Sequence, residues 1–323
     1  MTDDFRVSVI IPTYNGLRFL PACLDALRDQ NYPAEQTEII VVDDASTDGT
    51  IPFLRDRYPE VQIVALAHNA GLAAGCNTGA ARAHGELLVM LNNDTEVEPG
   101  WLAALVAAAR GNPEAGAIAS KMLLFDRRDT LHNAGDIMGA DGIPRNRGVW
   151  QQDAGQFDDL PTVFGGCGGG VAYRRAAWEA AGGFDERLFM YLEDVDLAWR
   201  LQLLGWSAIF APEARLYHHL SATGGGVLSS FYTGRNTIWV IAKDMPGALV
   251  RRHFGRILAA QGRVMRDALV AWRGEAARAR LRGQLAGLLG LPRVLAWRRV
   301  TQATRRVSTT ALAALLVQDE TPQ

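Results

Sequence analysis

Cysteine is scarce in this 323-residue chain, and long uncharged apolar runs are missing from it. Cys23, Cys76 and Cys167 are far apart, odd in number and in no metal-binding spacing, which favours a reducing compartment such as the cytosol. No uncharged apolar stretch reaches the roughly 18 residues of a membrane-spanning helix, so none is expected. The polar first residues lead straight into a strand pattern, so we expect no signal peptide and a cytoplasmic protein.

Two common nucleotide-binding motifs are also missing. The first apolar run is not followed by Gly-x-Gly-x-x-Gly, and the chain contains no Gly-Lys-Ser/Thr. These absences exclude a dinucleotide-binding fingerprint and a P-loop. A nucleotide, if one is bound, must therefore be held in another way.

Lysine is missing from the C-terminal part of the chain. Residues 245–323 contain 14 Arg and no Lys against four acids, a formal charge of +10, while the net charge of −2 leaves −12 for the rest. A basic tail on an acidic body indicates contact of the tail with anionic lipid, a polyanion or another protein. The acidic body and the absence of a nucleic-acid-binding motif argue against nucleic acid as the partner.

What the chain does contain is a regular alternation of strand and helix patterns. Strands are predicted at Val7–Ile11, 38–42, 61–66 and Leu87–Leu91, each followed by a helical pattern. Such alternation predicts an α/β fold with a parallel sheet and right-handed crossovers. The length allows one large α/β domain with an appendage.

Polar clusters follow three of these strands, and the carboxyl ends of parallel strands share one edge of a sheet, where ligands bind. Asp43 can accept a hydrogen bond from the imide N–H of uracil or thymine, and Tyr14 can cover a base. Asn15 and Asn77 can reach ribose hydroxyls. Turn and helix-cap chemistry is the alternative for Asp43 and Asp44. The three clusters are Pro12-Thr13-Tyr14-Asn15-Gly16, Asp43-Asp44 and Asn92-Asn93-Asp94.

Asp94 is a lone carboxylate flanked by side-chain amides. This arrangement suits a hard divalent cation that keeps several waters and bridges phosphate oxygens. An Asx-type turn leading into the helix that starts near Pro99 is the alternative.

Three acids, Glu193, Asp194 and Asp196, fall in the first turn of a predicted helix. The helix dipole favours acids there and suffices to explain one or two of them. Carboxylates this close raise one another's pKa, and a carboxylate with a raised pKa can take the proton of a sugar hydroxyl. Upstream, the glycine-rich run 165–170 predicts either close approach of the backbone to a ligand or a flexible turn.

The order of these motifs resembles that of family 2 glycosyltransferases, and of their rhamnosyltransferase-like branch in particular, over about residues 7 to 244. The resemblance implies a GT-A type fold: a Rossmann-like, mostly parallel sheet flanked by helices. It also implies a nucleotide-diphosphate sugar donor and a Mg²⁺ or Mn²⁺ ion. Asn92-x-Asp94 stands where many members have Asp-x-Asp. The resemblance rests on Pro12-Thr13-Tyr14-Asn15, Val42-Asp43-Asp44-Ala45-Ser46-x-Asp48-Gly49-Thr50, Asn69-x-Gly71-x-Ala73-x-Gly75-x-Asn77 and Leu91-Asn92-Asn93-Asp94-Thr95.

The resemblance also assigns roles to single residues. By the family's Glu-Asp motif, Asp194 is the general base and Glu193 its neighbour. A histidine after residue 216 is implied on the metal side; His218 fits by position, and His219 is the alternative. The expected donor-binding residues are Pro12, Thr13, Tyr14, Asn15, Asp43, Asp44, Asn77, Asn93 and Arg235, and the expected metal ligands are Asp94 and His218.

Arg235 lies shortly after two aromatic residues, near the start of a predicted helix. Its guanidinium matches phosphate oxygens, so a contact with the donor diphosphate is one interpretation. Use on the surface or in an ion pair is the other.

We therefore expect a GT-A glycosyltransferase domain over residues 1–244, divided into a nucleotide-sugar half (1–120) and an acceptor half (121–244). The expected activity is inverting transfer from dTDP-rhamnose or a UDP-sugar to a hydroxyl of a glycan or lipid-linked acceptor in polysaccharide synthesis. A non-catalytic nucleotide-sugar binder or scaffold of the same fold is the alternative.

Residues 245–323 are predicted to form a basic helical extension. Trp272 and Trp297, each next to an Arg, would suit the headgroup level of an anionic membrane. The alternative is a helical subdomain packed on the body or on a second copy of the chain, since both need one apolar face.

Overall fold

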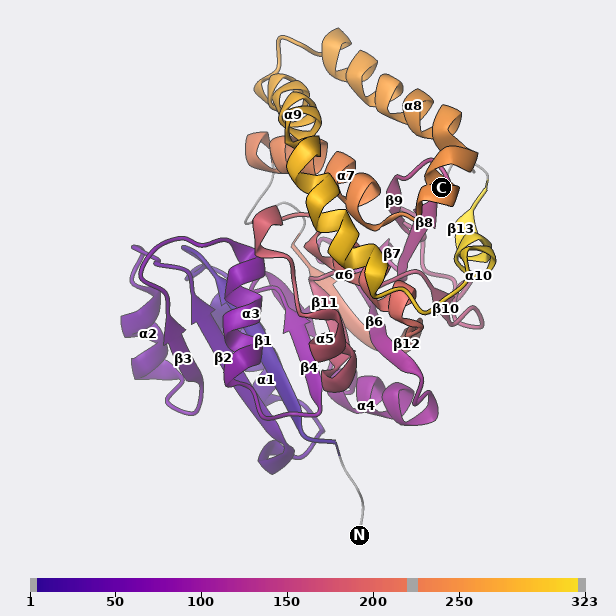
Figure 1. Cartoon of the computed structure of the whole chain (residues 1–323). Coiled ribbons are helices and arrows are strands. Elements are labelled where there is room, and N and C mark those ends of the chain that lie inside the picture. Colours follow the sequence, from indigo (N-terminus) through magenta and orange to yellow (C-terminus); the bar gives the residue numbers. More distant parts are fainter. Residues whose placement is uncertain (1–4, 220–225, 319–323) are drawn as a thin grey trace.

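A ten-stranded sheet forms the centre of the protein (Figure 1). The computed structural model describes residues 5–219 and 226–318. Residue 1, where the expected catalytic domain begins, and residue 323, where the expected extension ends, therefore lie outside the described residues. The strand order is β10-β12-β6-β11-β4-β1-β2-β3, with β5 on β12 and β7 on β6. The strands of the first half are β1 (Val7–Thr13), β2 (Thr37–Asp43), β3 (Gln62–Ala65), β4 (Leu87–Leu91) and β5 (Thr95–Val97).

The first half of the sheet is parallel, as the alternation of strands and helices predicts. β1 pairs in parallel with β2 and with β4, and β2 with β3. The register places Thr13 opposite Asp43, so two of the predicted polar clusters lie side by side at the carboxyl end. The crossovers are α1 (Leu20–Arg28), α2 (Thr50–Arg57) and α3 (Leu72–Arg82).

Beyond β4 the sheet is mixed, so the expectation of a mostly parallel sheet holds for the first half alone. β11 (Gly170–Arg174) runs antiparallel between β4 and β6 (Ala115–Leu124). β12 (Ser207–His218) is parallel to β6 and antiparallel to β5. The pairing of β12 with β5 brings the end of β12 next to the segment that follows β4.

The side chains of β4 alternate between two helical layers, which is why the strand reads as a continuous apolar run. Leu87, Val89 and Leu91 pack with α1 and α4 (Trp101–Gly111). Leu88 and Met90 face the other layer, formed by α3, α5 (Arg175–Ala181) and α6 (Glu193–Leu204). The fold is thus a three-layer α/β arrangement.

Residues 121–163 lack a clear periodicity in the sequence but are largely strands. β6 is buried along its whole length, so it shows no alternation. It is followed by β7 (Arg127–Asn133), β8 (Asp136–Gly139), β9 (Pro144–Asn146) and β10 (Thr162–Val163). β8 and β9 form a small sheet with β13 (Leu316–Val317), which returns from the C-terminal part of the chain.

The C-terminal part is helical, as expected, and it packs on the body. α7 (Val227–Asp244) and α9 (Glu275–Ala303) lie against each other, and glycines allow the close approach: a Cβ at Gly283 would lie 2.1 Å from the Phe231 carbonyl oxygen. α8 (Gly247–Val270) and α10 (Thr309–Ala314) complete the group. Figure 1 shows α7, α8 and α9 above the end of the sheet toward which β1 runs.

One apolar cluster crosses the predicted limit at residue 244. It joins Trp199 of α6 and Met138 of β8 to Leu249 and Ile257 of α8 and to Leu312 of α10. The extension therefore shares a core with the body, as the subdomain alternative requires.

Two details of the expected interfacial face are wrong. Ile257 is buried, whereas Phe254 and Leu258 beside it are exposed, because the inner face of α8 follows Leu249, His253 and Ile257. Trp297 packs edge-on against Trp239 and under Arg187 instead of facing solvent. Trp272 does remain exposed. Among residues 5–219 and 226–318, no helix is both long and apolar enough to span a membrane.

Candidate active site

A cavity of about 490 Å³ lies at the carboxyl end of β4. Its wall combines four acids with two histidines, and it is closed on the outer side by residues of α7, α8 and α9. The acids and histidines come from four separate segments of the chain. They are Asp94, His132, Asp136, Glu193, Asp194 and His218.

Asp94 and His218 meet on one side of this cavity. Asp94 lies in the turn between β4 and β5, and His218 ends β12, whose register places it opposite Thr95. His218 Nε2 is 3.3 Å from Asp94 Oδ1, with both side chains nearly buried. His219 points elsewhere: its ring stacks on Phe125, 3.6 Å between centroids. Of the two histidines that the sequence leaves open, His218 is therefore the one beside Asp94.

This pair suits a divalent cation bound together with a ligand. A carboxylate and an imidazole are both suitable donors, and Asn92 adds an amide to the same wall. The described part of the chain contains no group of three or more His, Cys, Asp or Glu side chains that could hold a metal by themselves. A cation here would thus need phosphate oxygens or waters to complete its shell, which Mg²⁺ commonly does.

His132 is a cavity residue that sequence reasoning missed. Its ring stacks on that of His218 with 4.9 Å between centroids. Burial and the neighbouring His218 lower the pKa of His132 to about 3, so this imidazole is neutral near pH 7. His132 lies in β7, in a segment where the weak periodicity of the sequence predicts no strand.

Glu193 and Asp194 also line the cavity, at the start of α6. Asp194 Oδ2 accepts a 2.8 Å hydrogen bond from the N–H of Gly168, and its Oδ1 accepts one from Val195. Burial raises the pKa of Asp194, although these N–H donors oppose the shift. Burial and the charge of Asp194 raise the pKa of Glu193 further. Both carboxyl groups therefore hold a proton at a higher pH than ordinary carboxyl groups do.

Asp136 is a second cavity residue, after His132, that sequence reasoning missed. It begins β8, is buried, and accepts a 2.5 Å hydrogen bond from Asn133 Nδ2. Burial and the nearby charge of Asp194 raise its pKa to about 7. Asp136 belongs to a strand in a segment of weak periodicity, so no local sequence pattern identifies it as a site residue.

The glycine-rich run lets the backbone approach α6 and the sheet closely. A Cβ at Gly165 would lie 2.6 Å from Ala198 Cβ, and one at Gly170 would lie 2.3 Å from Leu216 Cδ2. Gly165 and Gly170 thus allow close approach to neighbouring protein elements, whereas Gly168 and Gly169 of the same run line the cavity.

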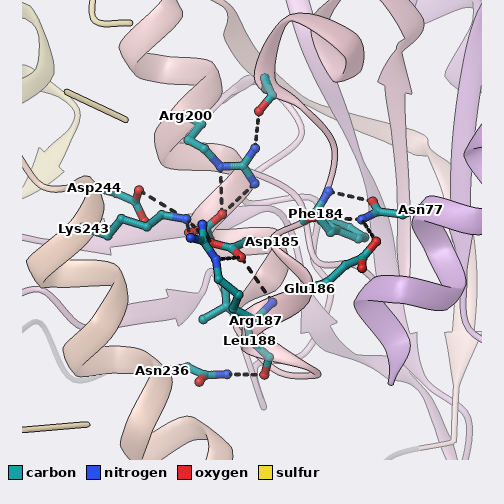
Figure 2. Close-up of polar contacts among 12 residues, drawn as sticks. Asn77, Phe184, Asp185, Glu186, Arg187, Leu188, Arg200, Asn236, Lys243 and Asp244 are labelled. Atoms are coloured by element: carbon teal, nitrogen blue, oxygen red, sulfur yellow. Dashed lines mark hydrogen bonds and ion pairs between the residues drawn. The ribbon is translucent and has the colours of Figure 1, made fainter. Parts of the chain in front are cut away.

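The loop before Glu193 has an unusual backbone. Phe189, Tyr191 and Leu192 all have positive φ, at 67°, 63° and 68°. Such conformations cost roughly 1–3 kcal/mol each and persist only when surrounding contacts hold them. Asn236 Nδ2 supplies these contacts: it lies 3.1, 3.0 and 2.7 Å from the carbonyl oxygens of Leu188, Met190 and Tyr191. Figure 2 shows the Asn236 amide aimed at Leu188.

A buried ionic cluster holds the same loop and α6 against α7 (Figure 2). Lys243 Nζ binds Asp185 at 2.5 Å and also contacts Asp196. Arg200, one turn further along α6, donates two hydrogen bonds to Asp196 Oδ2. Burial would raise the pKa of Asp196, but Arg200 and Lys243 hold it below its usual value. Asp196 is thus a structural acid beside Asp194.

The predicted nucleotide residues lie at the sheet edge but do not line the cavity. Thr13 Oγ1 accepts a 2.7 Å hydrogen bond from Asn93. Asp43 Oδ2 accepts one from Ser46 N–H, while its Oδ1 is buried without a hydrogen-bond partner among the described residues. Tyr14 is 50% exposed. An unpartnered carboxylate oxygen beside an exposed aromatic ring fits a base with an imide donor.

Three other predicted donor residues have structural contacts at this edge. Pro12, opposite Val42 in the register, belongs to the sheet. Asn15 Oδ1 accepts a hydrogen bond from Thr47 N–H and so joins two of the predicted polar clusters. Asp44 accepts 2.7 and 2.9 Å hydrogen bonds from the N–H groups of Ala70 and Gly71, which is the turn chemistry weighed above.

Asn77 and Arg235, two of the expected donor-binding residues, make hydrogen bonds to the protein. The Asn77 amide accepts from Phe184 N–H and donates to the Phe184 carbonyl and to Glu186 (Figure 2). Arg235 donates to the carbonyl oxygens of Arg187 and Leu188 and stacks on Tyr232 and Trp239. Both side chains fasten the loop over 184–188 through these hydrogen bonds.

Comparison with known proteins adds the family. Glycosyl transferase family 2 matches residues 8–181. The O-antigen biosynthesis protein RfbC of Myxococcus xanthus is 33% identical over 232 residues, which cover 68% of this chain and 18% of that protein. The N-acetylglucosaminyl-diphospho-decaprenol L-rhamnosyltransferase of Mycobacterium tuberculosis is 30% identical over 214 residues, 58% of this chain and 68% of that one.

Solved structures agree in fold. GalNAc-T7 with UDP, GalNAc and Mn²⁺ superposes with a TM-score of 0.61 at 19% identity, covering 75% of this chain and 48% of the other. The Staphylococcus aureus TarS fragment 1–349 with UDP-GlcNAc gives 0.59 at 17% identity, covering 97% and 93%. The chain belongs to glycosyl transferase family 2, in its rhamnosyltransferase-like branch, and has a GT-A fold with a C-terminal helical extension.

Proposed function

We propose that this protein is an inverting glycosyltransferase of polysaccharide or O-antigen synthesis. It would move a sugar from a nucleotide-diphosphate donor, dTDP-rhamnose or a UDP-sugar, to a hydroxyl of a glycan or lipid-linked acceptor. The observation that carries the proposal is that Asp94 with His218 and Glu193 with Asp194 line a single cavity. The names of the relatives support polysaccharide or O-antigen synthesis as the pathway and rhamnose as the transferred sugar. The name of the M. tuberculosis enzyme supports a lipid-diphosphate acceptor.

The donor would lie along the sheet edge. In this proposal Asp43 accepts the imide N–H of the base, Tyr14 covers the base, and Thr13, Asn15 and Asn93 shape the edge. Pro12 and Asp44 would act by holding that backbone in place, and Asn77 and Arg235 by fastening the loop near residue 186. Asp94 and His218 would hold a Mg²⁺ or Mn²⁺ ion, which would neutralise charge on the departing diphosphate. The GalNAc-T7 and Pyrobaculum calidifontis PcManGT structures contain Mn²⁺ with UDP and GDP-Man respectively, so the fold accommodates such a pair.

Asp194 would accept the proton of the attacking hydroxyl. Its raised pKa makes it a stronger base than an ordinary aspartate, and its two backbone hydrogen bonds fix its direction. Glu193, beside it, would orient the acceptor sugar. Attack from the Asp194 side displaces the diphosphate on the far side of the anomeric carbon. A single displacement inverts the configuration.

The basic helices would keep the enzyme at the cytoplasmic face of an anionic membrane, where a lipid-linked acceptor is found. Phe254, Leu258, Leu269 and Trp272 are all more than half exposed on or just after α8. Arg251 and Arg252 are exposed beside them. Apolar and basic side chains on one exposed helix match the requirements of an interfacial helix.

A donor screen followed by a single substitution tests the activity. Calorimetric titration with dTDP- and UDP-sugars, with and without Mn²⁺, identifies the donor, and turnover is then measured with a lipid-diphosphate sugar. Asp194→Asn should keep donor affinity and lose about 10²–10⁴-fold in rate. Donor binding with no turnover by the unchanged protein would favour the non-catalytic binder instead.

A further inference from the structure

The outer wall of the cavity contains two polar groups that the proposed reaction does not use. Gln261 and Val264 of α8 and Arg280 of α9 line the cavity together with Thr233 and Gly234 of α7. All of them belong to the helices above the sheet (Figure 1). The acids lie on the walls formed by the sheet and α6, so the cavity has a basic side as well as an acidic one.

Arg280 reaches this wall across the backbone of α7. A Cβ at Gly234 would lie 3.2 Å from Arg280 Cδ and 2.7 Å from its carbonyl oxygen, so the absence of a side chain at Gly234 gives the arginine its path. No hydrogen bond or ion pair joins the Arg280 guanidinium to any residue in the described ranges. The burial of this side chain lowers its pKa, and no carboxylate offsets the effect.

A partly buried guanidinium without a counter-charge is unfavourable, because burial removes water that nothing replaces. The nearby arginines show the usual alternative. Arg200 is paired with Asp196, and Arg298 donates to the carbonyl oxygens of Ala242 and Met245. Arg280 therefore stands out as a cation aimed at a cavity with its hydrogen-bonding capacity unused.

Gln261 presents a second donor on the same wall. Its Oε1 accepts a hydrogen bond from Gln284 Nε2, which fixes the amide orientation. Its own Nε2 is buried and has no hydrogen-bond partner among the described residues. Arg280 and Gln261 thus offer N–H groups and no acceptor, which is the chemistry of an oxyanion site.

We propose that Arg280 and Gln261 form a subsite for a phosphate oxyanion of the acceptor. The inference rests on the proposed function and adds the substrate class: a sugar carried on a phosphate or diphosphate. The donor diphosphate has its own place at Asp94 and His218, across the cavity. An acceptor hydroxyl at Asp194 and an acceptor phosphate at Arg280 would fill the cavity between two sides of opposite charge. The outer face of α8, with Leu258 and Leu269 exposed, would then meet the lipid of such an acceptor.

The test compares two acceptors that differ in the phosphate alone. Binding of a short-chain alkyl diphosphate-linked N-acetylglucosamine and of the neutral alkyl glycoside is measured by calorimetry without donor. Arg280→Met keeps the aliphatic stem that packs on Gly234, and Arg282→Ala, at an exposed position of the same helix, is the control. The unchanged protein should bind the diphosphate compound about tenfold or more tightly than the glycoside. Arg280→Met should remove this preference, Arg280→Lys should restore part of it, and Arg282→Ala should keep it.

Kinetics give the second readout. Arg280→Met should raise KM for the phosphorylated acceptor about tenfold or more and leave KM for the donor within twofold. An equal effect on donor KM would assign Arg280 to the donor and overturn the proposal. So would equal binding of both acceptors by the unchanged protein. An equal loss of affinity for phosphatidylglycerol vesicles without acceptor would identify the ligand as a lipid headgroup and also overturn it.

These outcomes separate the subsite from the activity. Phosphate-dependent binding that Arg280→Met abolishes, in a protein that transfers no sugar, would support the subsite and reject the transferase. Transfer that is indifferent to Arg280→Met would reject the subsite and leave the transferase standing.

Discussion

His218 Nε2 lies 3.3 Å from Oδ1 of Asp94, although one residue ends β12 and the other follows β4. The antiparallel pairing of β12 with β5 produces this contact. It places an imidazole beside the carboxylate that the sequence marks as the main candidate for a cation. Both side chains are nearly buried, so the charge on either one matters to the other.

Removal of the cation should weaken donor binding. Chelation, or Asp94→Ala, is expected to lower nucleotide-sugar affinity about tenfold or more, because the charge of the diphosphate would no longer be neutralised by the cation. His218→Ala should weaken Mn²⁺ binding by about 10–100-fold. Calorimetry with and without Mn²⁺ measures both.

His219→Ala is the matched control for His218→Ala, since His219 stacks on Phe125 away from Asp94. Equal effects of the two substitutions would contradict the assignment of His218. Full donor affinity in the presence of chelator would contradict the need for a cation.

Asp136 should make stability depend on pH. Unfolded aspartate has a pKa near 3.9, whereas that of folded Asp136 is about 7. Between these values only the folded state holds the proton, so this contribution to stability is complete at low pH and is lost as pH rises through 7. Asp136→Asn cannot ionise and should be more stable than the unchanged protein at pH 8, by up to about 4 kcal/mol.

The comparison is made by urea unfolding in chelator at several pH values. The advantage of Asp136→Asn should shrink toward pH 4. Asp56→Asn, at an exposed position of α2, should show no such trend. A constant difference between Asp136→Asn and the unchanged protein from pH 4 to pH 8 would rule out the raised pKa.

Asn236 should affect turnover more than donor binding. Asn236→Ala removes the donor that holds the carbonyl oxygens of the loop before Glu193, so the positive-φ residues lose their restraint. A displacement of about 1 Å at Asp194 would cost about 100-fold in kcat. Donor affinity, measured by titration, should fall less than kcat, because the hydrogen bonds of Asn236 are to this loop and not to the residues of the sheet edge.

Val240→Ala separates this effect from a general loss of stability. Val240 is buried one turn further along α7 in the apolar cluster, and its side chain has no polar group that could bind the carbonyl oxygens of the loop. Assays are run well below the unfolding temperature of both variants. A similar loss of kcat in Val240→Ala would mean that Asn236 acts through stability alone.

Lys243 should be among the most costly single substitutions. Lys243→Met leaves Asp185 and Asp196 buried without their shared cation, and breaking a buried pair costs about 3–5 kcal/mol. Urea unfolding gives the value. Arg28→Met is the control, since the Arg28–Glu60 pair is exposed and should contribute about 1 kcal/mol or less. A cost below 1 kcal/mol for Lys243→Met would show that the cluster is dispensable.

Membrane binding should depend on the exposed face of α8. The protein should sediment with phosphatidylglycerol vesicles at low salt and not with neutral phosphatidylcholine. Arg251→Ala with Arg252→Ala should weaken binding about tenfold or more, at roughly 1 kcal/mol per basic residue. Arg55→Ala with Arg57→Ala, on α2, should leave it unchanged. Sedimentation that ignores vesicle charge would remove the membrane from the proposal.

The sequence by itself determined the local elements and their order. Leu87–Leu91 is apolar on both faces and can only be a buried strand, and the polar residues after β1, β2 and β4 must share an edge once those strands are parallel. Asp194 in the first turn of α6 was also predictable, because acids and the repeated leucines mark the helix start. These features depend on neighbouring residues, so short-range patterns contain them.

Tertiary structure alone decided which distant side chains share the cavity. Consecutive residues of a strand point to opposite sides, so the β12–β5 register chose His218 over His219. Asp136 and His132 come from strands without periodicity, and the close packing of α9 on α7 brings in Arg280. Asn77 and Arg235 make hydrogen bonds to a loop distant from each of them in the sequence, and no local pattern predicts such long-range contacts.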